Sequence, residues 1–282
     1  MSFINYNGKT LPASTPVLTA NNRGFRYADG LFETLKFKNN EIILADEHLA
    51  RLWNGMKMME FDLPKLFTPD YIEDQILSLL SKNKSTSARV RLTVFRGNGG
   101  LYDPENLHPN FIIETIPLET HHGQLNSNGL QCCIYREAIK VIDSFSNLKS
   151  NQFLPYVMGA LYARKNKFND AILLNSNNSI CDSTIANVFL IKGDTIQTPA
   201  LADGCIAGVM RAFVINELKK NGYHISEETI LIDQLLDADE VFLTNSIYNI
   251  RWVAGIAESQ YQNSRTQQLF HLLQQTNPTV FC

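Results

Sequence analysis

Lys149 is the first side chain in this sequence whose surroundings suggest chemistry. It lies in Ser146-Asn147-Leu148-Lys149-Ser150-Asn151, just before a mostly apolar stretch that we expect to form a helix. A lysine between a loop and a buried helix loses solvation, which lowers the pKa of its amine and makes it available to attack a carbonyl. Taken alone, the residue is more simply a solvated surface lysine, because lysines are rarely buried.

Asp182 is the second candidate. It stands among small and apolar residues in Ser179-Ile180-Cys181-Asp182-Ser183-Thr184, between two expected strands. A carboxylate in such a place is suited to hold a proton on a pyridine nitrogen, which is what makes a pyridoxal ring an electron sink. A turn or a cap, where aspartate is common, is the alternative interpretation.

Two further segments are suited to bind a phosphate. Gly208 precedes an expected helix that starts at Val209, and the free N–H groups of Val209 and Met210 at such a start attract anions. Arg51, in His48-Leu49-Ala50-Arg51-Leu52, would add a fixed positive charge. A plain glycine-containing loop and a surface ion pair are the alternatives.

The elements that must position these side chains mix strands and helices without strict alternation. Residue alternation and turn residues predict strands at 31–38, 41–44, 89–95, 111–116, 130–135, 171–174, 188–191 and 240–244. Apolar residues at helical spacing predict helices at 46–59, 71–82, 152–167, 209–220 and 265–275. This irregular mixture favours an α+β fold over a doubly wound sheet.

Length and a polar stretch suggest two domains. The chain has 282 residues, and residues 117–129 are polar and include His121 and His122. We therefore expect a smaller N-terminal α+β domain at 1–118, a linker at 119–128, and a larger C-terminal α+β domain at 129–282 that carries Lys149.

Composition excludes several classes of protein. The net charge of −3 gives no general attraction to nucleic acid or to an anionic membrane. No apolar run reaches the roughly 18 to 20 residues of a membrane helix, and the N-terminus lacks a secretory signal, so we expect a cytoplasmic protein. The five cysteines are odd in number, and Cys132 and Cys133 are adjacent, which argues against a disulfide framework or a metal site.

Taken together and in order, these segments resemble the fold type IV enzymes that use pyridoxal 5'-phosphate (PLP), the class IV aminotransferase family. That family includes branched-chain aminotransferases, D-amino acid aminotransferases and 4-amino-4-deoxychorismate lyase, and the last is the most similar. The similarity covers most of the chain, at residues 22–34, 48–52, 148–150, 182–189, 198–199, 208–211 and 238–242.

The resemblance implies a role for each candidate residue. Lys149 would be the Schiff-base lysine and proton shuttle, and Asp182 would pair with the pyridine nitrogen. The remaining residues would hold the phosphate; they are Arg51, Gly208, Val209, Met210, and Asn245 and Ser246 in the turn after 241–244. The resemblance also implies a two-domain α+β fold, a small-molecule amino substrate and a homodimer.

The sequence departs from the family pattern at two of these positions. Asp182 stands where the family usually has glutamate, so its side chain is one methylene shorter and the ring must lie closer or a water must bridge. Ala28 replaces a glycine of the family's Tyr-Gly-Asp-Gly, a change we expect to be mild if its φ is negative.

Three features favour the lyase among the family's reactions. Thr34, in Phe32-Glu33-Thr34, is similar to the lyase, and its hydroxyl would relay a proton near the leaving group. Gly208-Val209-Met210-Arg211 is closer to the lyase's Gly-Ile-Met-Arg than to the aminotransferase's Gly-Ile-Thr-Arg. The loop 96–100 resembles a glycine-rich lyase loop, although Leu101 replaces an arginine and leaves a second substrate carboxylate without a partner.

Other interpretations stay open. Thr34 also fits as a β-branched strand residue, and the glycine-rich loop as a turn. The leading hypothesis is a lyase that converts 4-amino-4-deoxychorismate to 4-aminobenzoate and pyruvate in folate synthesis. The alternative is an aminotransferase for branched-chain or D-amino acids with 2-oxoglutarate, and a third interpretation is a non-catalytic PLP carrier.

Overall fold

The computed structural model describes residues 2–119 and 123–281 and divides the chain into two compact units. Unit 1 comprises Met1–Thr120 and Leu148–Gln152, and unit 2 comprises His121–Asn147 and Phe153–Cys282. Residues 120–122 of the expected linker lie outside the described residues.

One expectation about the domains is wrong. The short segment with Lys149 packs within unit 1 and not with the rest of the larger domain. The reason is backbone pairing, because Phe32 N donates to Lys149 O at 2.9 Å and Asn151 N donates to Gly30 O at 2.9 Å. Pairing of residues so far apart in the chain leaves no local pattern in the sequence.

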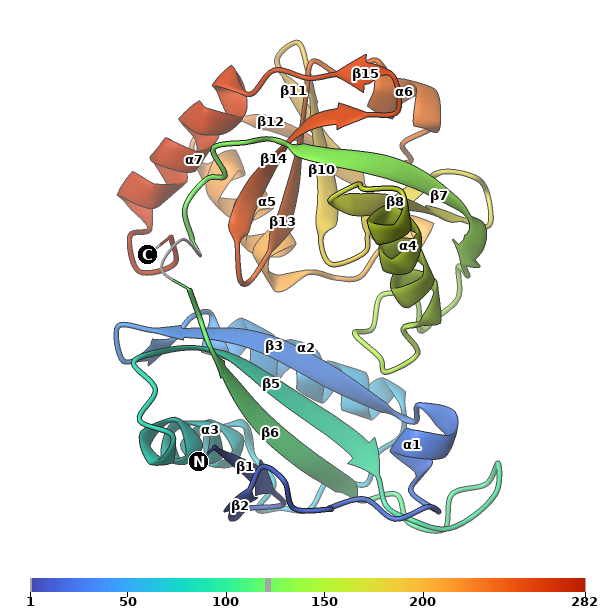
Figure 1. Ribbon diagram of the computed structural model, residues 1–282, viewed down its shortest axis with the longest axis vertical. Helices are drawn as coiled ribbons and strands as arrows, with labels where there is room; N and C mark the ends of the chain where they lie inside the picture. The colour runs from blue at the N-terminus through green and yellow to red at the C-terminus, as the bar shows by residue number, and fades with distance from the viewer. Residues whose placement is uncertain (1, 120–122, 282) are drawn as a thin grey trace. The chain divides into compact units, whose positions relative to one another are not determined.

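Unit 1 is a six-stranded antiparallel sheet with helices packed against it (Figure 1). The strand order is β2-β1-β6-β5-β3-β4. The strands are β1 (Phe3–Tyr6), β2 (Lys9–Pro12), β3 (Gly30–Lys38), β4 (Glu41–Ile42), β5 (Ser87–Arg96) and β6 (Pro109–Pro117), and the helices are α1 (Arg23–Tyr27), α2 (Ala45–Met58) and α3 (Pro69–Lys82).

The two long helices of unit 1 form where the sequence predicts them. In α2, Leu49, Leu52 and Met56 are buried at helical spacing and join one core with alternate residues of β3. At the start of α3, the Thr68 hydroxyl accepts a hydrogen bond from Tyr71 N at 3.2 Å, and Pro69 occupies the first turn, where its missing N–H is not needed.

Unit 2 is built on a nine-stranded mixed sheet with the order β12-β11-β10-β13-β14-β7-β8-β9 and β15 paired to β14. Its strands are β7 (Leu130–Lys140), β8 (Asp170–Asn175), β9 (Ile180–Ser183), β10 (Asn187–Lys192), β11 (Thr195–Pro199), β12 (His224–Glu228), β13 (Glu240–Asn245), β14 (Asn249–Ile256) and β15 (Ser259–Gln260). Its helices are α4 (Leu154–Lys165), α5 (Val209–Lys220), α6 (Ile232–Leu236) and α7 (Ser264–Thr276), with a 3₁₀ turn at Leu201–Asp203.

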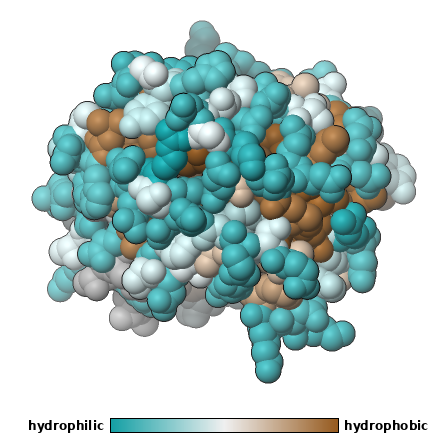
Figure 2. All heavy atoms as spheres, turned by 90° about the horizontal axis from the view of Figure 1, so that it is seen from above, coloured by the Kyte–Doolittle hydropathy of each residue, from teal (hydrophilic) through white to brown (hydrophobic). Residues whose placement is uncertain are grey.

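Helix α4 differs from the buried helix that the sequence suggests. Tyr156, Gly159 and Ala163 are its buried residues, whereas Leu154 and Leu161 are 69% and 52% exposed. Figure 2 shows that apolar side chains interrupt the mostly hydrophilic surface on the face it presents. Hydrophobicity alone therefore predicted the helix but not which side of it is covered.

The backbone at Ala28 is a second correction. Its φ is +52° and its ψ +32°, so it lies in the left-handed region at the C-terminus of α1 and not at the expected negative φ. The left-handed conformation ends the helix, and glycine adopts it at lower cost than alanine.

Cysteines and helix lengths add little to the function. Cys132, Cys133, Cys181 and Cys205 are buried free thiols, and Cys282 lies outside the described residues. Among the residues that the structure describes, no helix is both long and apolar enough to cross a membrane. No group of three or more potential metal-ligating His, Cys, Asp or Glu side chains occurs within 2–119 and 123–281.

Candidate active site

Lys149 lies on one face of strand β3. The segment around it extends the sheet as a short edge, because Leu31 pairs with Ser150. The Lys149 ammonium is 4.5 Å from the centroid of the Phe32 ring. Side chains alternate along a strand, so Thr34, which is partly exposed, faces the same way as Phe32. Unit 1 thus presents the Lys149 amine and the Thr34 hydroxyl on one face of its sheet.

Arg51 projects from α2 into a buried ion pair. Its Nε and Nη2 donate to the two carboxylate oxygens of Glu33 at 2.7 and 2.6 Å, and His48 Nδ1 is 2.7 Å from the same carboxylate. His48 and Arg51 are neighbours on one helix face, because residues three apart lie one above the other. The ion pair is 1% exposed at Glu33 and 15% at Arg51, so it is not the surface pair considered from the sequence.

Charge and burial compete at this cluster. Burial would raise the pKa of Glu33, but the charges of Arg51 and His48 and their hydrogen bonds outweigh burial and lower it to about 2. Burial lowers the pKa of His48 from its ordinary value, although Glu33 opposes this. The chemical result at neutral pH is a carboxylate that fixes the guanidinium of Arg51 in one orientation.

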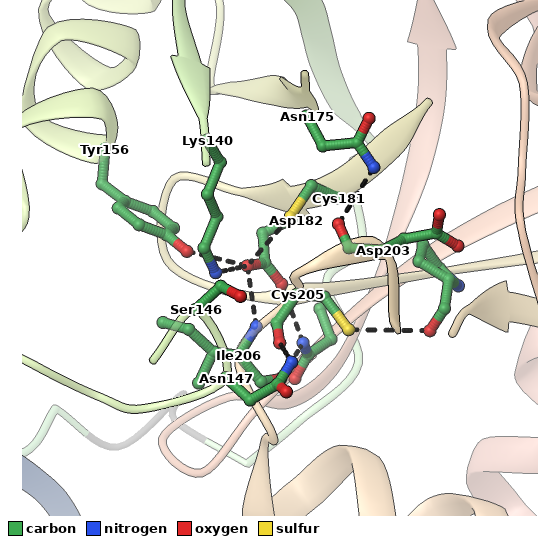
Figure 3. A network of polar contacts seen from close by, with 12 residues as sticks. Lys140, Ser146, Asn147, Tyr156, Asn175, Cys181, Asp182, Asp203, Cys205 and Ile206 are labelled. Carbon is green, nitrogen blue, oxygen red and sulfur yellow. Dashed lines mark hydrogen bonds and ion pairs between the residues drawn. The ribbon is translucent and has the colours of Figure 1, made fainter. Parts of the chain in front are cut away.

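Asp182 is the centre of the corresponding network in unit 2 (Figure 3). It lies within strand β9 and not between strands, and it is 2% exposed. Its Oδ2 accepts from Tyr156 Oη at 2.8 Å, from Ile206 N at 3.0 Å and from Lys140 Nζ at 3.2 Å, and its Oδ1 accepts from Asn187 Nδ2 at 2.8 Å. A turn or cap does not describe this residue, because four segments of unit 2 hold its carboxylate.

The start of α5 lies next to the same network. Asn187 Nδ2 also donates to Ile206 O at 2.9 Å, which connects Asp182 to the segment that leads into Gly208. Gly208 is the N-cap residue and offers no side-chain cap, so the first N–H groups of the helix, including those of Val209 and Met210, have no partner within the helix. A side chain at Gly208 would collide with Asn187 Oδ1, so only glycine fits.

The turn between β13 and β14 holds the last predicted residues. Asn245 Oδ1 accepts from Ile247 N at 3.0 Å and from Tyr248 N at 2.8 Å, so this side chain shapes the turn. Ser246 is partly buried within that turn. Thr244 pairs with Asn187 in the sheet and therefore shares its face, and its buried Oγ1 has no hydrogen-bond partner among the described residues.

Sequence reasoning missed several members of these networks. Lys140, Tyr156 and Asn187 reach Asp182 from residues 42, 26 and 5 positions away, and only the last lies near enough for a local pattern. Glu33 was within reach, because a buried carboxylate opposite His48 and Arg51 at helical spacing is a recognisable pattern. Thr244 was passed over for the two turn residues that follow it.

The two units, with these folds and clusters, have the architecture of fold type IV PLP enzymes. A branched-chain aminotransferase from Thermoproteus uzoniensis, solved with norvaline, aligns over 99% of this chain and 95% of its own with a TM-score of 0.89 and 21% identity. A 4-amino-4-deoxychorismate lyase from Pseudomonas aeruginosa aligns over 97% and 99% with a TM-score of 0.84 and 24% identity.

Sequence comparison identifies the family. The model of the amino-transferase class IV family matches residues 30–256, and the chain belongs to that family of enzymes. Aminodeoxychorismate lyase of Vibrio harveyi is 28% identical over 237 residues, which are 83% of this chain and 86% of the lyase. D-alanine aminotransferase of Bacillus licheniformis is 25% identical over 253 residues, 89% of this chain and 87% of that enzyme.

Proposed function

We propose that this protein is a PLP-dependent lyase that converts 4-amino-4-deoxychorismate to 4-aminobenzoate and pyruvate. The observation that carries the proposal is the common face of β3, where the Lys149 ammonium lies 4.5 Å from the Phe32 ring and Thr34 follows two residues later. The reaction is an elimination that needs no second substrate. A hydroxyl beside the lysine is suited to pass a proton to the departing group, a step that transamination does not require.

The residues present fit the proposed cofactor. Bound PLP would supply an aldehyde for the Lys149 amine and a protonated ring that draws electrons from the substrate's α-carbon. Asp182 would hold the ring nitrogen's proton, and the unfilled hydroxyl of Thr244 fits a phosphate oxygen that also meets the N–H groups of Val209 and Met210. Gly208 would let that phosphate approach closely, and Ser246 and Arg51 would add a hydroxyl and a positive charge.

Covalent connection supports assigning Lys149 and Asp182 to one reaction. Asn147 Nδ2 donates to Cys205 O at 2.6 Å, and Ala207 N donates to Asn147 O at 3.0 Å. Lys149 follows Asn147 by two residues, so its backbone begins within about 7 Å of this anchor. The intervening residue of that anchored segment, Ile206, is the one that donates to Asp182.

Arg91 is our candidate for binding the substrate carboxylate that loses its partner at Leu101. It lies opposite Thr34 in the β3–β5 pair, and its guanidinium is 4.0 Å from the centroid of the Phe32 ring. Burial, followed by the charge of Arg89, lowers the pKa of Arg91 from its ordinary value, although it remains a cation at neutral pH. A partly desolvated guanidinium binds a carboxylate more strongly than an exposed one.

The alternative is an aminotransferase for branched-chain or D-amino acids that uses 2-oxoglutarate. Its support is the similarity to the D-alanine aminotransferase and the fold shared with the branched-chain enzyme. The first half of the reaction would use the same lysine, and the two proposals separate at the fate of the substrate.

One assay distinguishes the proposals. Purified protein with PLP is incubated with 4-amino-4-deoxychorismate alone, and pyruvate is measured with lactate dehydrogenase. We expect pyruvate and 4-aminobenzoate in equal amounts without any oxo acid. Absence of pyruvate, together with glutamate formed from 2-oxoglutarate and a branched-chain or D-amino acid, would reverse the ranking. Turnover of either kind excludes a non-catalytic carrier.

We also propose that the protein is a homodimer. The apolar side chains that α4 leaves exposed support this, since Leu154, Val157 and Leu161 are 69%, 49% and 52% exposed on one helix. Light scattering after size exclusion should give twice the chain mass of 31.9 kDa. Leu161→Asp should shift the equilibrium toward the monomer, and an unchanged dimer would place the interface elsewhere.

A further inference from the structure

Asp182 has a positively charged partner within the protein itself. Lys140 Nζ lies 3.2 Å from Asp182 Oδ2, and the two side chains are 10% and 2% exposed. Figure 3 shows Lys140 and Tyr156 pointing toward this carboxylate from neighbouring positions. A buried ammonium requires a counter-charge, because its transfer out of water is costly. The pair therefore neutralises two buried charges at once.

The fold aims Lys140 at this position through an irregularity in the sheet. Strand β7 pairs with β8 in regular register up to Tyr135, and the register then shifts before Lys140 pairs with Asn175. Such bulges redirect a side chain, and they often occur beside active sites. The ammonium is also 5.4 Å from the centroid of the Tyr156 ring, which adds a favourable contact.

The donors are divided unequally between the two oxygens of Asp182. Oδ2 accepts from Lys140, Tyr156 and Ile206, whereas Oδ1 accepts from Asn187. Two carboxylate oxygens offer about four acceptor sites in all. Oδ1 is therefore the oxygen with capacity for a further donor such as a protonated ring nitrogen.

Charge then decides how strongly such a proton is held. Burial raises the pKa of both Tyr156 and Cys181, the other titratable groups in contact with Asp182, so both are neutral near neutral pH. Lys140 and Asp182 together carry no net charge, and a protonated ring nitrogen would add a second cation. A like charge nearby disfavours protonation.

We infer that Lys140 is a resident counter-ion of Asp182 that stabilises the cofactor-free protein and weakens the hold of the bound ring nitrogen on its proton. Lys140 is thus a tuning residue, since it acts on the cofactor through Asp182. The inference rests on the proposed cofactor, and it adds to that proposal a residue that sets the electron demand of the ring.

The test compares wild type, Lys140→Met and Lys140→Arg, each with and without PLP. Without cofactor, Lys140→Met leaves Asp182 without its counter-charge, and we expect its melting temperature to fall by about 5–10 °C. A protonated ring nitrogen then replaces the missing cation, so added PLP should raise the melting temperature by more in Lys140→Met than in wild type. The ¹⁵N shift of ring-labelled PLP should move toward that of a protonated pyridine. Lys140→Arg should resemble wild type in both measurements.

Each other outcome overturns the inference. Equal losses with and without PLP, with an unchanged ¹⁵N shift, would make Lys140 merely structural. A ¹⁵N shift toward unprotonated pyridine would mean that Lys140 orients Asp182 and does not oppose the ring's charge. Lys220→Met removes a lysine that is 70% exposed and pairs with Glu217, and it should change neither measurement. A wild-type protein that shows no Lys149-dependent visible absorbance with PLP would instead refute the cofactor assignment itself.

Discussion

Replacing Glu33 with glutamine is the sharpest test of the buried cluster that orients Arg51. Glutamine keeps the shape of the side chain but removes the charge that Arg51 and His48 contact at 2.6 to 2.7 Å. In the folded protein the pKa of Glu33 falls from the ordinary 4.5 to about 2. At about 1.4 kcal/mol for each pH unit, this corresponds to about 3 kcal/mol of stability near neutral pH. Loss of one partner from a buried ion pair typically costs a similar amount.

The sign of the pH dependence follows from the lowered pKa. Since the folded protein holds the Glu33 proton less tightly than the unfolded chain, the stabilisation is complete above about pH 5 and declines as pH falls toward 2. The difference in unfolding free energy between wild type and Glu33→Gln should therefore be about 3 kcal/mol at pH 7 and shrink below pH 5. His48 is buried in both proteins, so its own titration largely cancels in the difference.

Urea denaturation followed by tryptophan fluorescence measures this difference. Trp53 lies in α2 and stacks on Phe67 at 5.3 Å, so it reports on unit 1. A Trp252→Phe background removes the reporter of unit 2, which matters because two units need not unfold together. Glu41→Gln, at an exposed position, is the matched control. A difference below about 1 kcal/mol, or one that stays constant from pH 7 to pH 3, would refute the reasoning.

The remaining predictions concern the cofactor residues and the backbone. Lys149→Ala should remove the visible absorbance of bound PLP and nearly all activity while the fold survives, because only the backbone of Lys149 bonds to β3; retained absorbance would disprove the lysine assignment. Asp182→Ala should retain some PLP but slow α-proton loss by a factor of at least about 100, measured by exchange of the substrate proton with deuterated water; unchanged exchange would make Asp182 structural. Ala28→Gly should stabilise the protein by about 0.5–1 kcal/mol in urea denaturation because the left-handed φ of +52° suits glycine; destabilisation would show that the alanine methyl group packs favourably.

Local patterns in the sequence predicted most of the long elements. Helix α5 occupies the expected residues 209–220, and β3 and β13 lie within one residue of expectation. Spacing of apolar residues and turn residues act over a few positions, which is the range that a sequence pattern covers. Short strands such as β9 and β15 were missed because two to four residues carry too little periodicity.

The site divides in the same way. Lys149, Arg51 and the start of α5 were identifiable because each belongs to a short motif that resembles those of a known family. Their neighbours were not, since Lys140 reaches Asp182 across 42 residues through a shift in sheet register. Likewise, Arg51 meets Glu33 because α2 packs against β3, which no residue spacing specifies.

By itself, the sequence determined the type of chemistry, because an amine, an acid and a helix start are encoded as residue types at short spacings. The tertiary structure decided the charge that each group meets: Asp182 faces an ammonium, and Arg51 faces a carboxylate. The physical reason is that electrostatic interactions depend on distance in space and on burial, and both are set only when strands from distant parts of the chain pair in register.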